Sequence, residues 1–189
     1  QNDVPKAMLA KIAFDKYDIR FNKLWWSSFK IDGVRCMIRY DSANKKLLTA
    51  SRGGKNFTNA TTHICNNEVL IQLFKENPSL VLDGELYIHG KPLSYISGLA
   101  RRIYNVESAE KLNFYVFDIV EDKQFSDRLK TLKYVEKQLE NKAVLLEDMS
   151  ILEIVRFVEH EPVYSYNDVL EMHDRAIDEG YEGLVLRDP

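Results

Sequence analysis

The chain has 189 residues, of which 45% are hydrophobic and 29% are charged, and its formal net charge is −3. These values are typical of one soluble globular domain. The slightly negative charge excludes an overall basic field of the kind that drives non-specific binding to nucleic acids. No apolar run approaches the ~20 residues needed to span a bilayer, and the N-terminus lacks the pattern of a signal peptide.

The N-terminal half of the chain alternates short strands with helices. Apolar or alternating runs predict strands at residues 24–29, 36–40, 47–50 and 80–89, and the second and third form an antiparallel hairpin. Four apolar residues on one helical face predict a helix over residues 66–77, which Pro78 ends. These four are Val69, Leu70, Leu73 and Phe74. After a turn at residues 90–92, a second helix is expected over residues 93–104.

The C-terminal half begins with an apolar strand at residues 113–120 and continues with the helical stripe Leu129, Leu132, Val135 and Leu139. A strand is expected at residues 151–158. Ser165 and Asp168 then start a helix that ends at Gly180, and a last strand covers residues 181–186. The apolar face of this last helix comprises Val169, Met172, His173, Ala176 and Ile177. The pattern predicts an α+β fold of twisted antiparallel sheets flanked by helices, in one domain over residues 1–189.

Five polar motifs follow one another along this framework. They are Lys30-Ile31-Asp32-Gly33-Val34-Arg35, Ser51-Arg52-Gly53-Gly54-Lys55, Asp83-Gly84-Glu85, Tyr115-Val116-Phe117-Asp118 and Glu182-Gly183-Leu184-Val185-Leu186-Arg187. In this order they resemble the nucleotidyltransferase domain of ATP-dependent DNA ligases. The resemblance implies an ATP-grasp-like domain of twisted antiparallel sheets, and Ala7-Met8-Leu9-Ala10 is similar to the segment that precedes the lysine motif in that family.

The resemblance implies that Lys30 attacks the α-phosphate of ATP, releases pyrophosphate and carries AMP through a phosphoramide bond. Most exposed lysines only aid solubility, but this one follows an apolar strand and precedes an acidic-glycine-basic turn. A lysine amine attacks phosphorus only when uncharged, so the site has to favour that form by burial or by neighbouring positive charge. The pair Asp32-Gly33 is typical of a plain turn. In the family this aspartate also supports the lysine and lies near the metal.

Three further residues acquire nucleotide-binding roles from the resemblance. Arg35 would contact the ribose, and it favours ATP because NAD-dependent ligases typically carry a small residue at this position. Ser28 would read the adenine edge, and a buried strand serine is an equal alternative. Arg52 would face the phosphate, where a guanidinium can bind two oxygens at once. Gly53 replaces the asparagine common in the family, which leaves the shape of that turn open.

Acidic and aromatic residues complete the expected site. Asp83 and Glu85 are two residues apart in a strand, so both side chains point to one face. The resemblance implies that Glu85 binds ribose hydroxyls or metal-bound water. The alternative is that these residues form a β-bulge with solvated acids. The ring of Phe117 would stack on adenine, which is worth ~1–3 kcal/mol, although core packing is the default for such a residue. Glu182 and Asp32 would hold Mg²⁺ through oxygen ligands or their waters, and a solvated strand-edge acid is the alternative for Glu182.

The implied function is that of an ATP-dependent DNA ligase of replication, repair or recombination, with ATP and Mg²⁺ as cofactors. AMP would pass from Lys30 to a 5′-phosphate of nicked double-stranded DNA, the partner of the full-length protein, and a 3′-hydroxyl would then displace it. In the family a two-lysine motif and an OB-fold domain follow. Because the chain stops at Pro189 before either, we expect a domain that is incomplete at its C-terminus and adenylates itself slowly.

Other functions remain open at this point. An mRNA-capping guanylyltransferase also carries Lys-x-Asp-Gly-x-Arg, although the Ser51–Lys55 and Tyr115–Asp118 motifs favour a ligase. An RNA ligase and a non-catalytic nucleotide-binding module are the further alternatives. Labelling by GTP, sealing of RNA and the effect of replacing Lys30 would distinguish them. Cys36 and Cys65 are isolated, which predicts reduced thiols in an intracellular protein, cytoplasmic or nuclear. We also expect a monomer.

Overall fold

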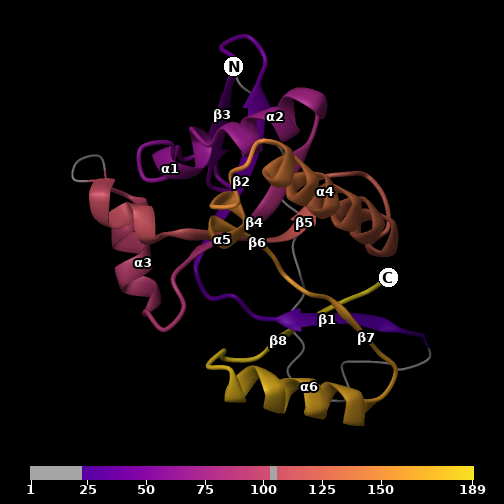
Figure 1. Ribbon diagram of the computed structural model, residues 1–189. Coiled ribbons are helices and arrows are strands. Elements are labelled where there is room, and N and C mark those ends of the chain that lie inside the picture. Colours follow the sequence, from indigo (N-terminus) through magenta and orange to yellow (C-terminus); the bar gives the residue numbers. More distant parts are fainter. Residues whose placement is uncertain (1–22, 103–105) are drawn as a thin grey trace.

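The computed structural model describes residues 23–102 and 106–189, which form two β-sheets with helices packed against them (Figure 1). The larger sheet has the strand order β3-β2-β4-β5-β6 and the smaller one β7-β1-β8. The strands are β1 (Trp25–Phe29), β2 (Val34–Asp41), β3 (Lys46–Ala50), β4 (Val81–Tyr87), β5 (Asn113–Ile119), β6 (Val155–Phe157), β7 (Glu161–Val163) and β8 (Leu184–Arg187). Neighbouring strands are antiparallel except β5 and β6, which are parallel. The predicted α+β class is confirmed.

The helices lie at the outer sides of both sheets. They are α1 (Thr62–Cys65), α2 (Glu68–Glu76), α3 (Leu93–Ala100), the 3-10 helix η2 (Val106–Lys111), α4 (Phe125–Leu145), α5 (Ile151–Ile154) and α6 (Tyr166–Asp178). In Figure 1, α2 and α4 lie against the larger sheet and α6 lies along the smaller one. Within residues 23–102 and 106–189, no helix combines the length and apolar character that a membrane crossing requires.

The hydrophobic core lies between the larger sheet and helices α2 and α4. The sheet contributes Cys36, Ile38, Leu82, Leu86, Phe114 and Val116, and the helices contribute the two apolar faces predicted from the sequence, all buried. Burying a Leu, Val or Phe side chain contributes about 1.5–3 kcal/mol. The apolar faces of α2 and α4 together therefore determine which face of the larger sheet the helices cover. Because side chains alternate along a strand, the intervening residues of β2, β4 and β5 point to the other side, toward the smaller sheet.

Local hydrogen bonds confirm several predicted boundaries. The β2–β3 hairpin turns where the Asp41 carboxylate accepts bonds from the backbone N–H groups of Ala43 and Asn44, at 3.1 and 3.3 Å. Helix α2 begins where the Asn67 side chain accepts from the backbone of Leu70 at 3.2 Å. Helix α6 begins at Ser165, whose hydroxyl accepts from Asp168 N at 3.1 Å. Such caps satisfy backbone donors that have no partner inside the helix.

The predicted strand over residues 151–158 is wrong in its first half. Residues Ile151–Ile154 form the single helical turn α5, and only Val155–Phe157 pair with β5. The Asp148 carboxylate accepts hydrogen bonds from the backbone and hydroxyl of Ser150, which turns the chain immediately before α5. A short apolar run fits a buried strand and a buried helical turn equally well, so tertiary packing decides between them.

Two other predicted elements differ at one end, and the buried face of α6 is narrower than predicted. Strand β8 begins at Leu184 rather than at residue 181, because residues 179–183 form the turn that leaves α6. On α6, Met172 and Ala176 are buried as expected, whereas His173 and Ile177 are exposed. Gly180 ends α6 with a φ of 86°, as its position after the helix predicted. The helix expected over residues 93–104 ends at Ala100; residues 103–105, like the segment 7–10, lie outside the described residues.

Candidate active site

Lys30 follows β1 directly and stands beside the turn that carries Glu182. Its backbone N–H donates to the carbonyl of Gly183 at 2.9 Å. The side chains of Lys30, Asp32 and Glu182 line one cavity of about 340 Å³, together with residues from the end of β4 and the loop after it. The Lys30 side chain itself is exposed. The fold thus brings the predicted nucleophile and both predicted metal ligands to one place, although they come from opposite ends of the chain.

Two glycines of the motifs are required by close backbone approach. A Cβ atom on Gly33 would lie 2.1 Å from the carbonyl oxygen of Leu86, and one on Gly84 would lie 2.1 Å from that of Tyr115. Only glycine fits where two backbones come this near. The pairing register of β4 and β5 also shifts between Asp83 and Gly84. These glycines let β4 lie against both the Lys30 motif and β5, and so they set the spacing of the site.

Arg35 on β2 forms a doubly hydrogen-bonded ion pair with Asp83 on β4. Its Nε and Nη2 atoms donate to the two carboxylate oxygens, both at 2.6 Å. The Asp83 carboxylate is fully buried. Burial raises the pKa of Asp83, and the charge of Arg35 opposes that shift. The resemblance implied a ribose contact for Arg35 and no separate role for Asp83. The position of Asp83 two residues before Glu85 was the available signal.

Glu85 lies opposite Arg35 in the pairing of β2 with β4. Burial raises its pKa to about 8, and the nearby negative charge of Asp83 adds to the shift while Arg35 opposes it. A carboxyl group with this pKa is largely protonated at neutral pH and can donate a hydrogen bond as well as accept one. It faces the space between the sheets on the same side as Arg35, as the alternation of the strand predicted.

Phe117 is buried, and two arginines lie over its ring. The guanidinium carbon of Arg35 is 4.8 Å from the centroid of its ring and that of Arg187 is 5.0 Å away. The ring is 8% exposed. Arg187 also reaches within 3.8 Å of the buried carboxylate of Asp118, which Arg128 binds at 2.9 Å. No role was predicted for Arg187. Its place at the end of the Glu182 motif was the only sequence signal for its contacts with Phe117 and Asp118.

Two predicted nucleotide-binding residues lie elsewhere in the fold. Ser28 is buried on β1, where it pairs with Val185 of β8. Arg52 is exposed in the loop after β3, which closes on itself through a 2.7 Å bond from Ser51 N to Lys55 O. Neither residue lines the cavity of Lys30, and Arg35, Glu85 and Phe117 do not line it either. Their predicted contacts with adenine and phosphate therefore stay predictions.

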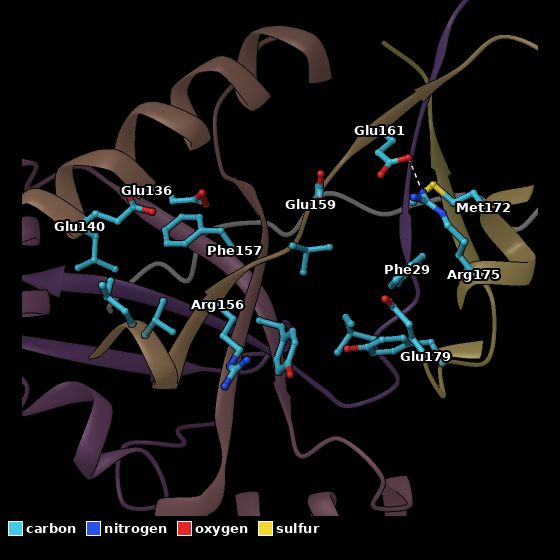
Figure 2. Close-up of a pocket in the computed structure, with 17 residues that line it drawn as sticks. Phe29, Glu136, Glu140, Arg156, Phe157, Glu159, Glu161, Met172, Arg175 and Glu179 are labelled. Carbon is cyan, nitrogen blue, oxygen red and sulfur yellow. Dashed lines mark hydrogen bonds and ion pairs between the residues drawn. The ribbon is translucent and has the colours of Figure 1, made fainter. Parts of the chain in front are cut away.

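A larger cavity of about 520 Å³ lies between α4, β6 and α6, and Figure 2 shows its lining. Its walls carry several acids, and the Arg175 guanidinium donates to Glu161 at 2.5 Å. None of the predicted site residues lines it, although Tyr181 lines both cavities. The larger cavity is therefore distinct from the one that contains the motif lysine.

The acids near Lys30 suit a magnesium ion better than a metal held by protein ligands alone. Among residues 23–102 and 106–189, no three His, Cys, Asp or Glu side chains converge on one point. Mg²⁺ commonly binds through one or two carboxylates, with waters and substrate phosphates filling its other positions. Asp32 and Glu182, in one open cavity beside Lys30, provide such a pair.

The fold has two sheets, with a lysine at the exit of β1, the central strand of the smaller sheet, and acids near this lysine. This arrangement is that of the adenylation domain of a covalent nucleotidyltransferase. Residues 7–189 match the family described as the ATP dependent DNA ligase domain. The match covers nearly the whole chain, and the chain belongs to this family.

Curated relatives and solved structures agree with this assignment. The DNA ligase of African swine fever virus (isolate Pig/Kenya/KEN-50/1950) is 36% identical over 106 residues, which cover 56% of this chain and 23% of that protein. The isolate from tick in Malawi (Lil 20-1/1983) gives the same values. The adenylated DNA ligase of Chlorella virus superposes with a TM-score of 0.66 at 22% identity, over 99% of this chain and 60% of that one.

A further similar structure is mycobacterial DNA ligase D, solved with ATP and MES, with a TM-score of 0.56 at 18% identity. It covers 88% of this chain and 49% of that one. At these identities the structural likeness shows the fold. The chain spans less than two thirds of the length of the relatives it matches.

Proposed function

We propose that Lys30 forms a covalent bond to AMP. The uncharged Nζ of Lys30 attacks the α-phosphorus of ATP, an N–P bond forms, the bond to the bridging oxygen breaks, and pyrophosphate leaves. The proposal rests on one observation: Lys30, Asp32 and Glu182 line a single cavity.

The residues of the chain contribute to this step in different ways. The bond from Lys30 N to the Gly183 carbonyl fixes the backbone of the nucleophile against the Glu182 turn. Arg35 and Glu85 present a guanidinium and a mostly protonated carboxyl group from one sheet face, which suits the ribose hydroxyls. A reactant held in this way reacts as if within one molecule, which removes much of the entropic barrier.

Asp32 and Glu182 would hold Mg²⁺, which supplies charge stabilisation at the phosphate oxygens. In the protein as a whole, we propose that AMP then passes to the 5′-phosphate of a nicked DNA duplex and that the 3′-hydroxyl displaces it, sealing the strand. We further propose that the protein acts as a monomer inside the cell. Support for that compartment comes from Cys36 and Cys65, both buried free thiols.

The experiment that tests this proposal is incubation of the protein with ATP labelled at the α-phosphate, in the presence of Mg²⁺. We expect label on the protein, formed slowly, and none on Lys30→Ala. Lys75→Ala is the matched control, because Lys75 is an exposed lysine in the last turn of α2. Label that persists in Lys30→Ala, or label taken from GTP in preference to ATP, would contradict the proposal.

A further inference from the structure

The turn between α6 and β8, residues 179–183, is held at both of its ends. At one end the carbonyl of Gly183 accepts the backbone N–H of Lys30 at 2.9 Å. At the other end the carbonyl of Glu179 binds Nε2 of His89 at 2.8 Å. Glu182 lies between these two points. We infer that His89 is a positioning residue that fixes Glu182 relative to Lys30, an inference that rests on the proposed function of both.

His89 forms one hydrogen bond through each of its two ring nitrogens. A backbone carbonyl only accepts, so Nε2 carries a hydrogen and donates to Glu179. Nδ1 is hydrogen-bonded to the hydroxyl of Tyr87 at 2.9 Å. Tyr87 is buried at the end of β4 and lines the cavity of Lys30. The ring of His89 therefore connects the larger sheet to the turn of the smaller one with one bond on each side.

Ring packing reinforces this connection. The centroid of the His89 ring is 4.5 Å from that of Tyr181, the residue directly before Glu182. The ring of Tyr181 in turn lies 5.2 Å from that of Phe29, the residue directly before Lys30. Aromatic pairs at these distances contribute stability beyond their area burial. The contacts run from β4 through the turn to β1, beside the residues proposed to carry the reaction.

The close contact between His89 and the turn leaves little room for the turn to shift toward it. A Cβ atom on Gly180 would lie 3.3 Å from Nε2 of His89. His89 itself is not among the residues that line the cavity. It therefore acts through the position of the turn, and its removal should loosen the Glu182 carboxylate without removing any group that touches ATP. Partners that orient a metal-binding carboxylate typically change metal affinity by about 10–100-fold when they are replaced.

The test uses two His89 variants and a matched control in the full chain. His89→Leu removes both hydrogen bonds, whereas His89→Gln keeps a side-chain N–H that can reach the Glu179 carbonyl. His63→Leu is the control, because Nε2 of His63 also binds a backbone carbonyl, that of Leu112, at 2.8 Å in another part of the fold. The rate of lysyl-AMP formation is measured across Mg²⁺ concentrations for each protein.

For His89→Leu we expect the Mg²⁺ concentration at half-maximal rate to rise by about tenfold. His89→Gln should stay within about twofold of the unchanged protein, and His63→Leu should not alter the Mg²⁺ dependence. Amide hydrogen exchange is measured on the same proteins without ATP or metal. Residues 179–183 should exchange faster in His89→Leu and at the original rate in His63→Leu.

Each outcome bears on one of the two proposals. Unchanged Mg²⁺ dependence and unchanged exchange of the turn in His89→Leu would overturn the inference, as would an equal effect of His63→Leu. If the unaltered protein forms no lysyl-AMP at all, the proposed function fails, and the exchange measurement alone then decides whether His89 holds the turn.

Discussion

The buried imidazole of His160 should make the fold sensitive to mild acid. His160 is 6% exposed, its ring lies 5.2 Å from that of Phe125, and neither ring nitrogen has a hydrogen-bond partner among residues 23–102 and 106–189. Burial, helped by the positive charge of Arg187, lowers the pKa of His160 to about 3. Folding therefore requires this ring to be neutral over the whole range between that value and its ordinary pKa of 6.5.

The sign and size of the effect follow from proton linkage. Below pH 6.5 the unfolded chain binds a proton at His160 that the folded protein does not bind. The stability due to the neutral ring is complete above this pH and is lost as the pH falls toward 3, at ~1.4 kcal/mol per pH unit. Between about pH 7 and about pH 5 the free energy of unfolding should therefore fall by about 2 kcal/mol through this residue alone.

The assay is urea unfolding at both pH values, followed by the fluorescence of Trp25 and Trp26. His160→Leu removes the titrating group, so its loss of stability between the two pH values should be about 2 kcal/mol smaller than that of the unaltered protein. His173→Leu, which changes an exposed histidine of α6, should lose as much as the unaltered protein. If His160→Leu lost stability as steeply on acidification as the unaltered protein, the reasoning from burial would be refuted.

Three further predictions follow from the candidate active site. Arg35→Met leaves the buried carboxylate of Asp83 unpaired and should lower the free energy of unfolding by about 3–5 kcal/mol. Adding Asp83→Leu removes that carboxylate and should recover part of the loss, as measured by urea unfolding. A double variant as unstable as Arg35→Met would contradict the buried ion pair. Gly33→Ala places a methyl group 2.1 Å from a backbone oxygen and should destabilise the fold and abolish labelling from ATP. Gly98→Ala in α3 should instead stabilise the fold by about 0.5–1 kcal/mol in thermal melts, because within the described part of the chain the added methyl group meets nothing within 4 Å beyond its chain neighbours and the local helix backbone. The raised pKa of Glu85 means that its contribution to stability is complete below pH 4.5 and is lost as the pH rises through about 8. Glu85→Gln, neutral at every pH, should therefore show a smaller decline in unfolding free energy between about pH 6 and about pH 9 than the unaltered protein, and an equal decline would show that Glu85 is ionised throughout.

Much of the fold was predictable because its signals are local. The apolar faces of α2 and α4, the hairpin β2–β3 and the Ser165 cap of α6 depend on residues a few positions apart, and all are observed. The failures came where local pattern is ambiguous. Residues 151–154 are as compatible with a strand as with the helical turn that packing selects.

The candidate site divides in the same way. The resemblance carried by the motifs predicted the family, which the family match confirms. The roles of the lysine and the two acids stay predictions, although the fold places all three in one cavity. The sequence could not predict that Arg35 would bind Asp83, that Arg187 would lie over the ring of Phe117, or that Arg52 would remain apart from the cavity of Lys30. A motif shows which residue types occur and at what spacing along the chain. Which side chains pair depends on which strands lie next to each other in the sheet, as β2 and β4 do for Arg35 and Asp83.

The sequence alone therefore determined most of the secondary structure and the set of candidate reactive groups, because helix faces, caps and turns are encoded over a few neighbouring residues. Only the tertiary structure decided how these groups meet. Lys30 lies beside the turn that carries Glu182 because β1 pairs with β8. Glu85 lies opposite Arg35 because β2 pairs with β4. Strand pairing over long separations is fixed by burial of the whole sheet, and no local pattern contains it.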